Sequence, residues 1–314
     1  IARRLKGTWS LHDKATGQVL DQRDQVIARV PHLFDAGTFV FRGNDTTLQH
    51  QQRLKAGSFV RRKDNGELEA HANLLPGKGV GHRYLLDPDK GLFKIKMGQA
   101  EMPVLPLLKA MGTTDQEFRD AWGADLYAAN MQKSEAGVLN KLAAKILPKA
   151  DRENLDEGYR RQKLVEGFGK MQLDPDVMKR TLGMPATGVT KEVILATTKK
   201  LLGVSRGEAK VDDRDHLAYQ SFFGPEDLFA ERIRRDHGRV RKTLFMKASL
   251  DGNLRKFPSS AMTPQLEQAL MGSGLGQAVE EINPAEVFDK LTRITRMGEG
   301  GIPSVEAVPD EARG

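Results

Sequence analysis

The sequence predicts an α+β protein with several domains, because strand signals fill its first third and helix signals dominate its middle. Short alternating runs over residues 1–100 are separated by turn sequences such as Asn65 with Gly66 and Asp87 to Gly91, which is typical of β-hairpins. From residue 113 the apolar spacing changes to that of helices. At 314 residues the chain is also longer than one hydrophobic core usually supports. We therefore expect two or three compact units.

A helical insert is predicted for about 113–202. Thr114 and Glu117 have the spacing of a capping box, and three apolar side chains then continue one helix face: Phe118, Trp122 and Leu126. Proline and glycine break this insert into short helices, at Asp174, Pro175, Gly183, Pro185 and Gly188. The stretch 203–213 is a predicted linker.

A further helix is predicted for 225–247, with an apolar stripe and a polar face rich in arginine. The stripe consists of Phe229, Ile233, Val240 and Leu244. Between Glu231 and Lys247 the basic residues are Arg232, Arg234, Arg235, Arg239, Arg241, Lys242 and Lys247. An excess of cations attracts phosphates, so one interpretation is a DNA contact. A solvated face, or a packing face for an acidic partner subunit, is an equally weighted alternative.

The last predicted helix begins at Asn283, an N-cap residue followed by Pro284 and, three residues after the cap, by Glu286. Three cations follow at three-residue spacing, which places them along one helix face: Lys290, Arg293 and Arg296. That face suits a phosphate backbone, with a solvated helix end as the alternative. Glycines between 297 and 301 are expected to end the helix and to allow a mobile tip with positive φ.

Composition favours a polyanion partner and excludes several protein classes. The chain has 49 Lys and Arg against 42 Asp and Glu, a net charge of +7, and its isoelectric point is near 9.4. There is no cysteine, so disulfides and thiolate metal sites are excluded. No apolar run approaches the roughly 20 residues of a membrane span, and no signal-peptide pattern opens the chain. We expect a cytoplasmic protein without a membrane role.

Several enzyme-like patterns do not hold up. Asp212, Asp213, Asp215 and His216 resemble a metal cluster by composition, but neighbouring carboxylates in an extended chain point to opposite sides. The glycines of 77–81 lack the ending of a phosphate-binding loop, and those of 272–276 follow a predicted helix opened by Thr263 and Pro264. No metalloprotease or serine-hydrolase motif is present. We therefore expect no catalytic residue and no metal ligand in this chain.

Four blocks, in order, resemble one family. GSGLGQAVEEINPAEVFDKLTRITRMGEGGI, at 272–302, resembles the segment of the multi-subunit RNA polymerase β subunit that lines the RNA–DNA hybrid. The matching residues there are Leu275, Gln277, Asn283, Pro284, Arg293, Gly298, Gly300 and Gly301. The block at 30–59 resembles the start of the protrusion domain, with a half-buried strand through Phe39 and Phe41 closed at Gly43. The blocks at 79–112 and 211–223 resemble the lobe and the return to the protrusion.

The resemblance implies a specific domain order. A mixed β protrusion would comprise 1–72 and 211–255, with a largely helical lobe, 73–210, inserted between them. A helical fork and hybrid-binding segment would follow at 256–314. Residues 113–208 match no motif of the family.

The resemblance also implies a function. The chain would be the N-terminal part of β in a DNA-directed RNA polymerase, and it would line the DNA channel and the RNA–DNA hybrid site during transcription. The implied nucleic-acid-binding residues are Gln277, Lys290, Arg293 and Arg296, and the implied fork loop contains Gly298, Gly300 and Gly301. No cofactor would be bound by this chain, because the catalytic Mg²⁺ belongs to aspartates of a β′-like subunit.

The implied partners are that β′-like subunit, the remaining C-terminal part of β, the DNA template and the RNA–DNA hybrid, with α-like and σ-like subunits as further candidates. An alternative from another class is a stand-alone basic adaptor that binds DNA or a polymerase without a catalytic role.

The sequence departs from the family in two places. Paired arginines that follow the glycine loop in the family are replaced by Ser304 and Glu306, and the chain stops before a later conserved block of β. We therefore expect a divergent, phage-encoded polymerase in bacterial or infected-host cytoplasm, or packaged in a virion. Its β would be either split between polypeptides or truncated here.

Overall fold

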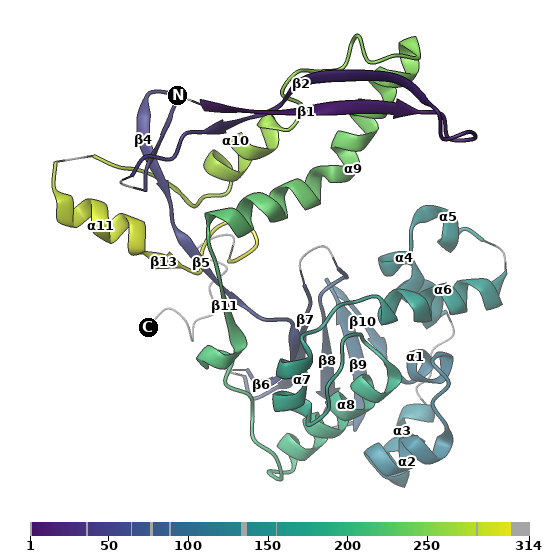
Figure 1. Cartoon of the computed structure of the whole chain (residues 1–314). Coiled ribbons are helices and arrows are strands. Elements are labelled where there is room, and N and C mark those ends of the chain that lie inside the picture. Colours follow the sequence, from purple (N-terminus) through teal and green to yellow (C-terminus); the bar gives the residue numbers. More distant parts are fainter. Residues whose placement is uncertain are drawn as a thin grey trace. The chain divides into compact units, whose positions relative to one another are not determined.

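The computed structural model describes residues 2–302, apart from 36, 64, 76–77, 88, 133–136, 155 and 281. The chain forms two compact units (Figure 1). Unit 1 combines Ile1–Arg53 with Phe222–Gly314, and unit 2 is the continuous stretch Leu54–Ser221. Helices and strands are both abundant, so the predicted α+β class is confirmed.

Unit 1 is built from short sheets and three helices in its described part. Its strands are β1 (Ala2–His12), β2 (Val19–Pro31), β3 (Phe39–Phe41), β4 (Asn44–Leu48), β5 (His50–Leu54), β11 (Gln220–Phe223), β12 (Gly276–Ala278) and β13 (Ile294–Thr295). Its helices are α9 (Pro225–Asp251), α10 (Thr263–Met271) and α11 (Pro284–Thr292). The sheet orders are β1-β2, β12-β4-β3 and β11-β5-β13. The chain passes between the units in β5 and β11.

The long β1-β2 ribbon is held by the segment that joins α9 to α10. The amides of Ser260 and Met262 donate to carbonyl oxygens of β2 at 2.7 and 3.1 Å, and Trp9 packs edge-on against Phe257 at 5.0 Å between ring centroids. A two-stranded ribbon alone is marginal in water, so this third edge stabilises it. A separate apolar cluster joins the small sheet to the helices: Phe39, Phe41, Leu48, Leu228, Leu270 and Leu275.

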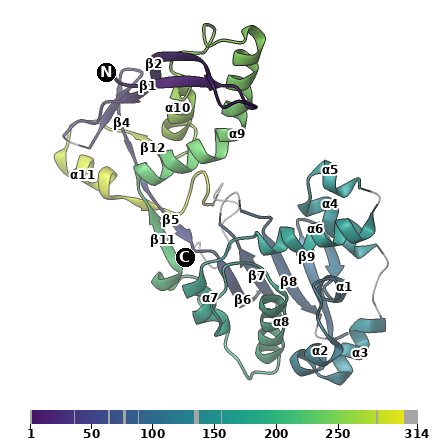
Figure 2. The same cartoon turned by 45° about the vertical axis from the view of Figure 1, so that its right-hand side comes forward.

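Unit 2 is a five-stranded antiparallel sheet covered by helices (Figure 2). Its strands are β6 (Gly57–Arg62), β7 (Leu68–Asn73), β8 (His82–Asp87), β9 (Leu92–Met97) and β10 (Ala100–Pro103), in the order β10-β9-β8-β7-β6. Its helices are α1 (Leu105–Ala110), α2 (Asp115–Trp122), α3 (Ala124–Gln132), α4 (Val138–Ile146), α5 (Lys149–Arg152), α6 (Glu157–Gly169), α7 (Pro175–Leu182), α8 (Lys191–Ser205) and the 3₁₀ turn η1 (Leu217–Tyr219). Each strand pairs with its sequence neighbour, so every connection in this sheet is a hairpin.

Aromatic packing anchors the helices of unit 2 on the sheet. Trp122 of α2 stacks on Phe93 of β9 with 4.6 Å between ring centroids, and its indole N–H donates to the Thr198 hydroxyl of α8 at 2.9 Å. The buried Trp122 therefore has a partner for its polar atom, as a core tryptophan requires.

His82 is a buried titratable group in this core. The ring is 2% exposed, its Nδ1 lies 3.0 Å from the Val80 carbonyl oxygen, and its Nε2 lies 2.9 Å from the Tyr84 hydroxyl. Burial disfavours the charged imidazolium and lowers the pKa of His82 to about 4. Burial likewise raises the pKa of the Tyr84 hydroxyl, so this pair is neutral over the physiological range.

The predicted local signals are mostly confirmed. Thr114 and Glu117 form the capping box of α2, and Gly66 has the positive φ of the predicted hairpin turn. The helix does not continue to Leu126, because Gly123 with φ 87° ends α2 and a new helix begins. The helix predicted for 225–247 is α9, whose stripe is buried at Val240 and half-buried at the other three positions.

The compact units divide the chain at other points than the expected domains. Strands β6 and β7, expected in the 1–72 protrusion segment, pair with β8 in the sheet of unit 2. Residues up to 221 also belong to unit 2, rather than ending at 210. Unit 2 is one continuous stretch between the two separated stretches of unit 1, with boundaries at 53/54 and 221/222, and the assignment of protrusion, lobe and fork segment to these residues stays a prediction.

The acidic segment after α8 is structural. Asp212 accepts from Lys200 Nζ at 2.6 and 2.8 Å and from the Val60 amide at 2.8 Å, while Asp213 accepts from the Asp215 amide at 3.0 Å. Over the described ranges, no group of three or more Asp, Glu or His side chains is arranged to hold a metal ion. None of the helices in those ranges is both long and apolar enough to cross a membrane.

Candidate nucleic-acid interface

The candidate interface is the segment 272–302 of unit 1. Its two strands, β12 before α11 and β13 after it, pair with the consecutive strands β4 and β5. β12 pairs antiparallel with β4, with Gln277 opposite Thr47. β13 pairs in parallel with β5, with Ile294 opposite His50. Because β4 and β5 are consecutive in the sequence, they fix both ends of the stretch that contains α11.

α11 begins where the sequence predicts. The Asn283 side chain accepts from the Ala285 amide at 3.0 Å, and Pro284 occupies the first helical turn. The expected second half of a capping box is not present, because the Glu286 carboxylate pairs with Lys290 at 2.7 Å instead.

The predicted row of three cations along one helix face is wrong. α11 ends at Thr292, and Arg293 is its C-cap residue with the extended dihedrals φ −63° and ψ 133°. The Arg293 carbonyl accepts from the His50 amide at 3.2 Å, which draws the chain into β13. Arg296 lies beyond that strand. Tertiary pairing with β5 therefore ends the helix one residue before the second predicted cation.

Lys290 of α11 and the C-cap residue Arg293 each have an acidic partner one helical turn earlier. Lys290 pairs with Glu286 at 2.7 Å and also donates to the Ala278 carbonyl at 3.2 Å, and Arg293 pairs with Asp289. Both acids are about half exposed, at 49% and 58%. Exposed pairs of this spacing contribute only about 0.3–0.5 kcal/mol, so a phosphate can displace either acid at little cost.

Gln277 lies on the strand that leads into this segment. Its Oε1 atom is buried and has no hydrogen-bond partner among the residues that the structure describes. A buried acceptor without a donor is destabilising by about 1–3 kcal/mol. Because this oxygen is buried, it can accept from a donor of another molecule only after the Gln277 side chain turns towards the surface.

The predicted glycine loop is a tight turn, named here the glycine turn, over residues 297–302. Gly298 and Gly300 have φ of 100° and 87°, as predicted. The Gly301 amide donates to the Gly298 carbonyl at 3.0 Å, and the Ile302 amide donates to the Arg296 carbonyl at 2.9 Å. A side chain has no room at 300 or 301: a Cβ would lie 2.4 Å from the Arg53 guanidinium or from the Arg296 carbonyl oxygen, respectively.

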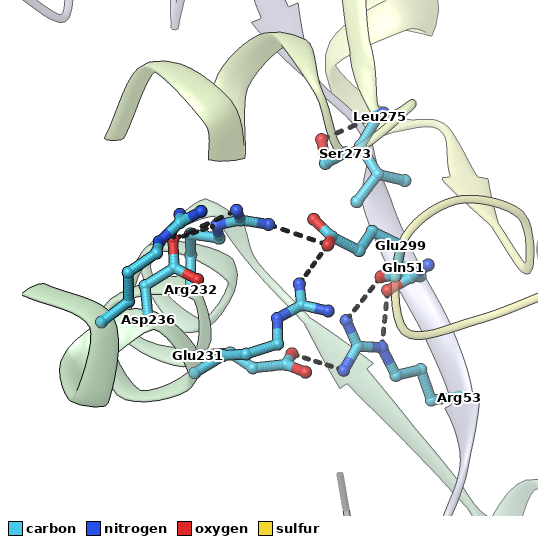
Figure 3. Close-up of polar contacts among 10 residues, drawn as sticks. Gln51, Arg53, Glu231, Arg232, Asp236, Ser273, Leu275 and Glu299 are labelled. Atoms are coloured by element: carbon cyan, nitrogen blue, oxygen red, sulfur yellow. Dashed lines mark hydrogen bonds and ion pairs between the residues drawn. The ribbon is translucent and has the colours of Figure 1, made fainter. Parts of the chain in front are cut away.

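Side chains of β5 and α9 contact the glycine turn, while the mobility expected for its tip stays a prediction. Figure 3 labels five of the residues responsible: Gln51, Arg53, Glu231, Arg232 and Glu299. Together with Arg235, which pairs with Glu299, they are named here the Arg53–Glu299 cluster. The Glu299 carboxylate pairs with Arg232 at 2.9 Å and with Arg235, both on α9, and its amide donates to the Ser273 carbonyl at 2.7 Å.

Arg53 fixes the other side of the same turn. This side chain is 7% exposed and donates to the Glu231 carboxylate at 2.5 Å, to the Gln51 amide oxygen at 2.6 Å and to the Glu299 carbonyl at 3.0 Å. Its guanidinium also lies 4.3 Å from the centre of the Phe223 ring. Planar, multidentate contacts of this kind suit arginine and not lysine.

Gln51 completes the cluster by contacting the first residue of the glycine turn. It is fully buried, and its amide donates to the Met297 carbonyl at 2.7 Å. The sequence argument did not select Gln51, Arg53, Glu231 or Glu299 as site residues. The one local signal was Glu299, an acid placed within the glycine run of 298–301.

The structure thus brings part of the predicted site together. Gly298, Gly300 and Gly301 share one turn, and Lys290 lies against the β12 end through the Ala278 carbonyl. Arg293 lies at the far end of α11, beside β5. The residues expected after the turn, Ser304 and Glu306, lie outside the described part of the chain.

Comparison with known proteins places this geometry in context. The chain is similar to proteins named DNA-directed RNA polymerase subunit beta from Synechococcus elongatus (24% identical), Thermosynechococcus vestitus (23%) and Gloeobacter violaceus (22%). Each alignment covers 96% of this chain but only 29–30% of the relative, so the chain spans about 30% of the length of these proteins. No protein-family model matches the chain. The similarity to named β subunits confirms the resemblance drawn from the four sequence blocks.

Proposed function

We propose that this chain acts as the N-terminal part of the β subunit of a multi-subunit DNA-directed RNA polymerase, and that segment 272–302 holds nucleic acid during transcription. The observation that carries the proposal is the similarity to named β subunits over 96% of the chain. The two-ended attachment of the segment to β4 and β5 is consistent with a rigid support for a ligand.

The proposed mechanism is exchange of acids for phosphates. Lys290 and Arg293 are held in place by Glu286 and Asp289 while no ligand is bound. A phosphodiester of the nucleic-acid backbone offers the same charge and the same number of anionic oxygens as the carboxylate. Its binding also releases condensed counterions, and this gain favours replacement of the carboxylate. Gln277 would add an acceptor for a base or a ribose hydroxyl once its side chain has turned out of its buried position.

The chemical step is assigned to another subunit. Nucleotidyl transfer requires Mg²⁺, which we propose is held by a β′-like partner, while this chain positions template and hybrid electrostatically. The further partners are the remainder of β and α-like or σ-like subunits. A phage origin and a cytoplasmic location are part of the same proposal.

Purification tests the assignment. A tagged copy of the full chain, expressed in its source cells, is expected to copurify with a β′-like polypeptide, and the purified complex is expected to synthesise RNA on promoter DNA with nucleotides and Mg²⁺. Recovery of the chain with DNA but without a β′-like polypeptide, or with an intact polymerase that already contains a complete β subunit, would instead establish the basic adaptor as its function.

Two substitutions that are expected to change the lifetime of the complex in opposite directions test the exchange mechanism. Arg293→Ala removes a phosphate ligand and is expected to shorten the lifetime of the assembled complex on an RNA–DNA hybrid about tenfold or more, since a charge-assisted hydrogen bond is worth about 1.5–3 kcal/mol. Asp289→Asn removes the competing acid and is expected to lengthen the lifetime. Arg119→Ala, an exposed arginine of α2, is the control. The same change of lifetime for Arg293→Ala and Arg119→Ala would refute the mechanism.

A further inference from the structure

The second half of α9 has a surface that neither unit 1 nor the proposed nucleic-acid site uses. Three large apolar side chains of this helix are mostly exposed: Phe245 at 72%, Met246 at 55% and Leu250 at 76%. Single exposed apolar residues are ordinary, but Met246 and Leu250 are surface neighbours one turn apart and Phe245 comes directly before Met246, so the three expose apolar area on adjoining parts of one helix. Monomeric proteins rarely leave such patches in water without a function.

The patch is bordered by cations in a regular pattern. Residues four apart on a helix are neighbours, so Arg241 lies next to Phe245, and Lys242, Met246 and Leu250 form a parallel row. Arg234 continues the first row two turns earlier. We name these six residues the α9 outer face. Val240, on the opposite side of the helix, is buried, and α9 packs on α10 within unit 1 (Figures 1 and 2).

The cations of this face differ from the other arginines of α9. Arg232, Arg235 and Arg239 are paired with Glu299 or Asp236. Arg234, Arg241 and Lys242 are exposed and have no acidic partner within the described part of the chain. Between His237 and Leu250 the sequence contains no Asp or Glu at all. The face therefore combines uncompensated positive charge with exposed apolar area.

We infer that the α9 outer face docks an acidic, amphipathic segment of another polypeptide of the complex, an inference that rests on the proposed function. Charge complementarity selects this occupant. Carboxylates satisfy Arg234, Arg241 and Lys242, while apolar side chains between them cover Phe245, Met246 and Leu250, as in interfaces with an apolar centre and a polar rim.

Other occupants fit less well. A nucleic-acid backbone would satisfy the cations but leave Met246 and Leu250 in water, because phosphates and sugars offer them no apolar cover. Two copies of this chain related by a two-fold axis would bring the same cations face to face, and like charges at an interface are repulsive.

Photo-crosslinking within the native complex tests the inference. The chain carries p-benzoylphenylalanine in place of Phe245, the complex is purified from source cells and irradiated, and the linked peptide is sequenced by mass spectrometry. The expected product is a peptide of a different polypeptide in which Asp and Glu outnumber Lys and Arg. The double reversal Arg241→Glu with Lys242→Glu is expected to reduce the yield at least tenfold.

The matched control is the double reversal Lys179→Glu with Arg180→Glu, two adjacent exposed cations of α7 in unit 2, which is expected to leave the yield unchanged. A product with nucleic acid, with a second copy, with another part of the same chain or with a peptide without excess acid overturns the inference. So does the absence of any product. RNA synthesis by the same preparation reports separately on the proposed function, since an active complex without the crosslink would disprove only the docking surface.

Discussion

Glu299 is the residue whose removal most directly tests how the glycine turn is held. Glu299→Gln keeps the size of the side chain and one acceptor oxygen but removes the charge that Arg232 and Arg235 share. A hydrogen bond to a charged group is worth about 1.5–3 kcal/mol. Because the Glu299 side chain is 27% exposed, solvent screening favours the lower part of that range, about 1.5–2 kcal/mol.

This loss is expected to raise the open population of the turn about 10- to 30-fold, at about 1.4 kcal/mol per factor of ten. Amide hydrogen exchange measures that population. The amides of residues 299, 301 and 302 donate to Ser273, Gly298 and Arg296, respectively, and are expected to exchange faster by this factor. Glu267→Gln, at an exposed position on α10, is the control.

Two amides near the β4–β12 pairing distinguish local opening of the turn from general destabilisation of unit 1. The Val279 amide donates to the Asp45 carbonyl and the Gln49 amide to the Leu275 carbonyl. These two are expected to keep their wild-type exchange rates, because the opening is local. Equal exchange of the turn amides in the Glu299→Gln and Glu267→Gln proteins would refute the role assigned to the carboxylate. Faster exchange of all five amides would mean general destabilisation of unit 1.

Three further predictions concern stability. Asp212→Asn removes the counter-charge of Lys200, which is 16% exposed and keeps its hydrogen bond to the Thr181 carbonyl, and is expected to lower the free energy of unfolding of unit 2 by about 1.5–3 kcal/mol in urea titrations. Glu208→Gln, at an exposed position, is expected to change it little. The pKa of His82 is lowered in the folded protein, so its contribution to the free energy of unfolding is complete above the unfolded pKa of about 6.5 and is lost as the pH falls towards 4. The wild-type free energy of unfolding is therefore expected to decrease between pH 6.5 and pH 5, and His82→Gln is expected to make this decrease smaller by about 1.5 kcal/mol. Gly300→Ala and Gly17→Ala both place alanine at positive φ, which costs about 1–2 kcal/mol. Only the Cβ at position 300 also meets the Arg53 guanidinium, so the melting temperature of the Gly300→Ala protein is expected to be the lower of the two. Equal melting temperatures would contradict the packing described for the glycine turn.

Local features of the fold were predictable because their causes lie within a few residues. The Asn283 cap, the Thr114 capping box and the positive φ of Gly298 depend on short-range sterics and hydrogen bonds. The end of α11 was not predictable from the sequence, because it is set by the pairing of β13 with β5, a strand more than 200 residues earlier. Nothing in the local sequence favours a stop at Thr292.

The candidate site was predictable only in part for the same reason. The Arg53 side chain meets Glu231 and the Glu299 carbonyl, partners separated from it by 178 and 246 residues. Charge patterns along a single helix cannot reveal such pairs, and they overstated the free positive charge of α9 and α11. The positive φ of Gly298 and Gly300 was predicted correctly, but the contacts that hold the turn became visible only with the tertiary structure.

The division of unit 1 into two distant stretches has a consequence for synthesis on the ribosome. Unit 2 is continuous, so all of its hairpins and helices can form as soon as it has emerged. Strands β4 and β5 emerge earlier, yet two of the strands that pair with them, β12 and β13, are translated only after unit 2. The nascent chain therefore carries open strand edges throughout the translation of unit 2, and these edges are templates for wrong pairing. A ribosome pause between residues 222 and 276 would prolong that exposure, whereas a pause within unit 2 after its sheet is complete would not affect the folding of the sheet itself.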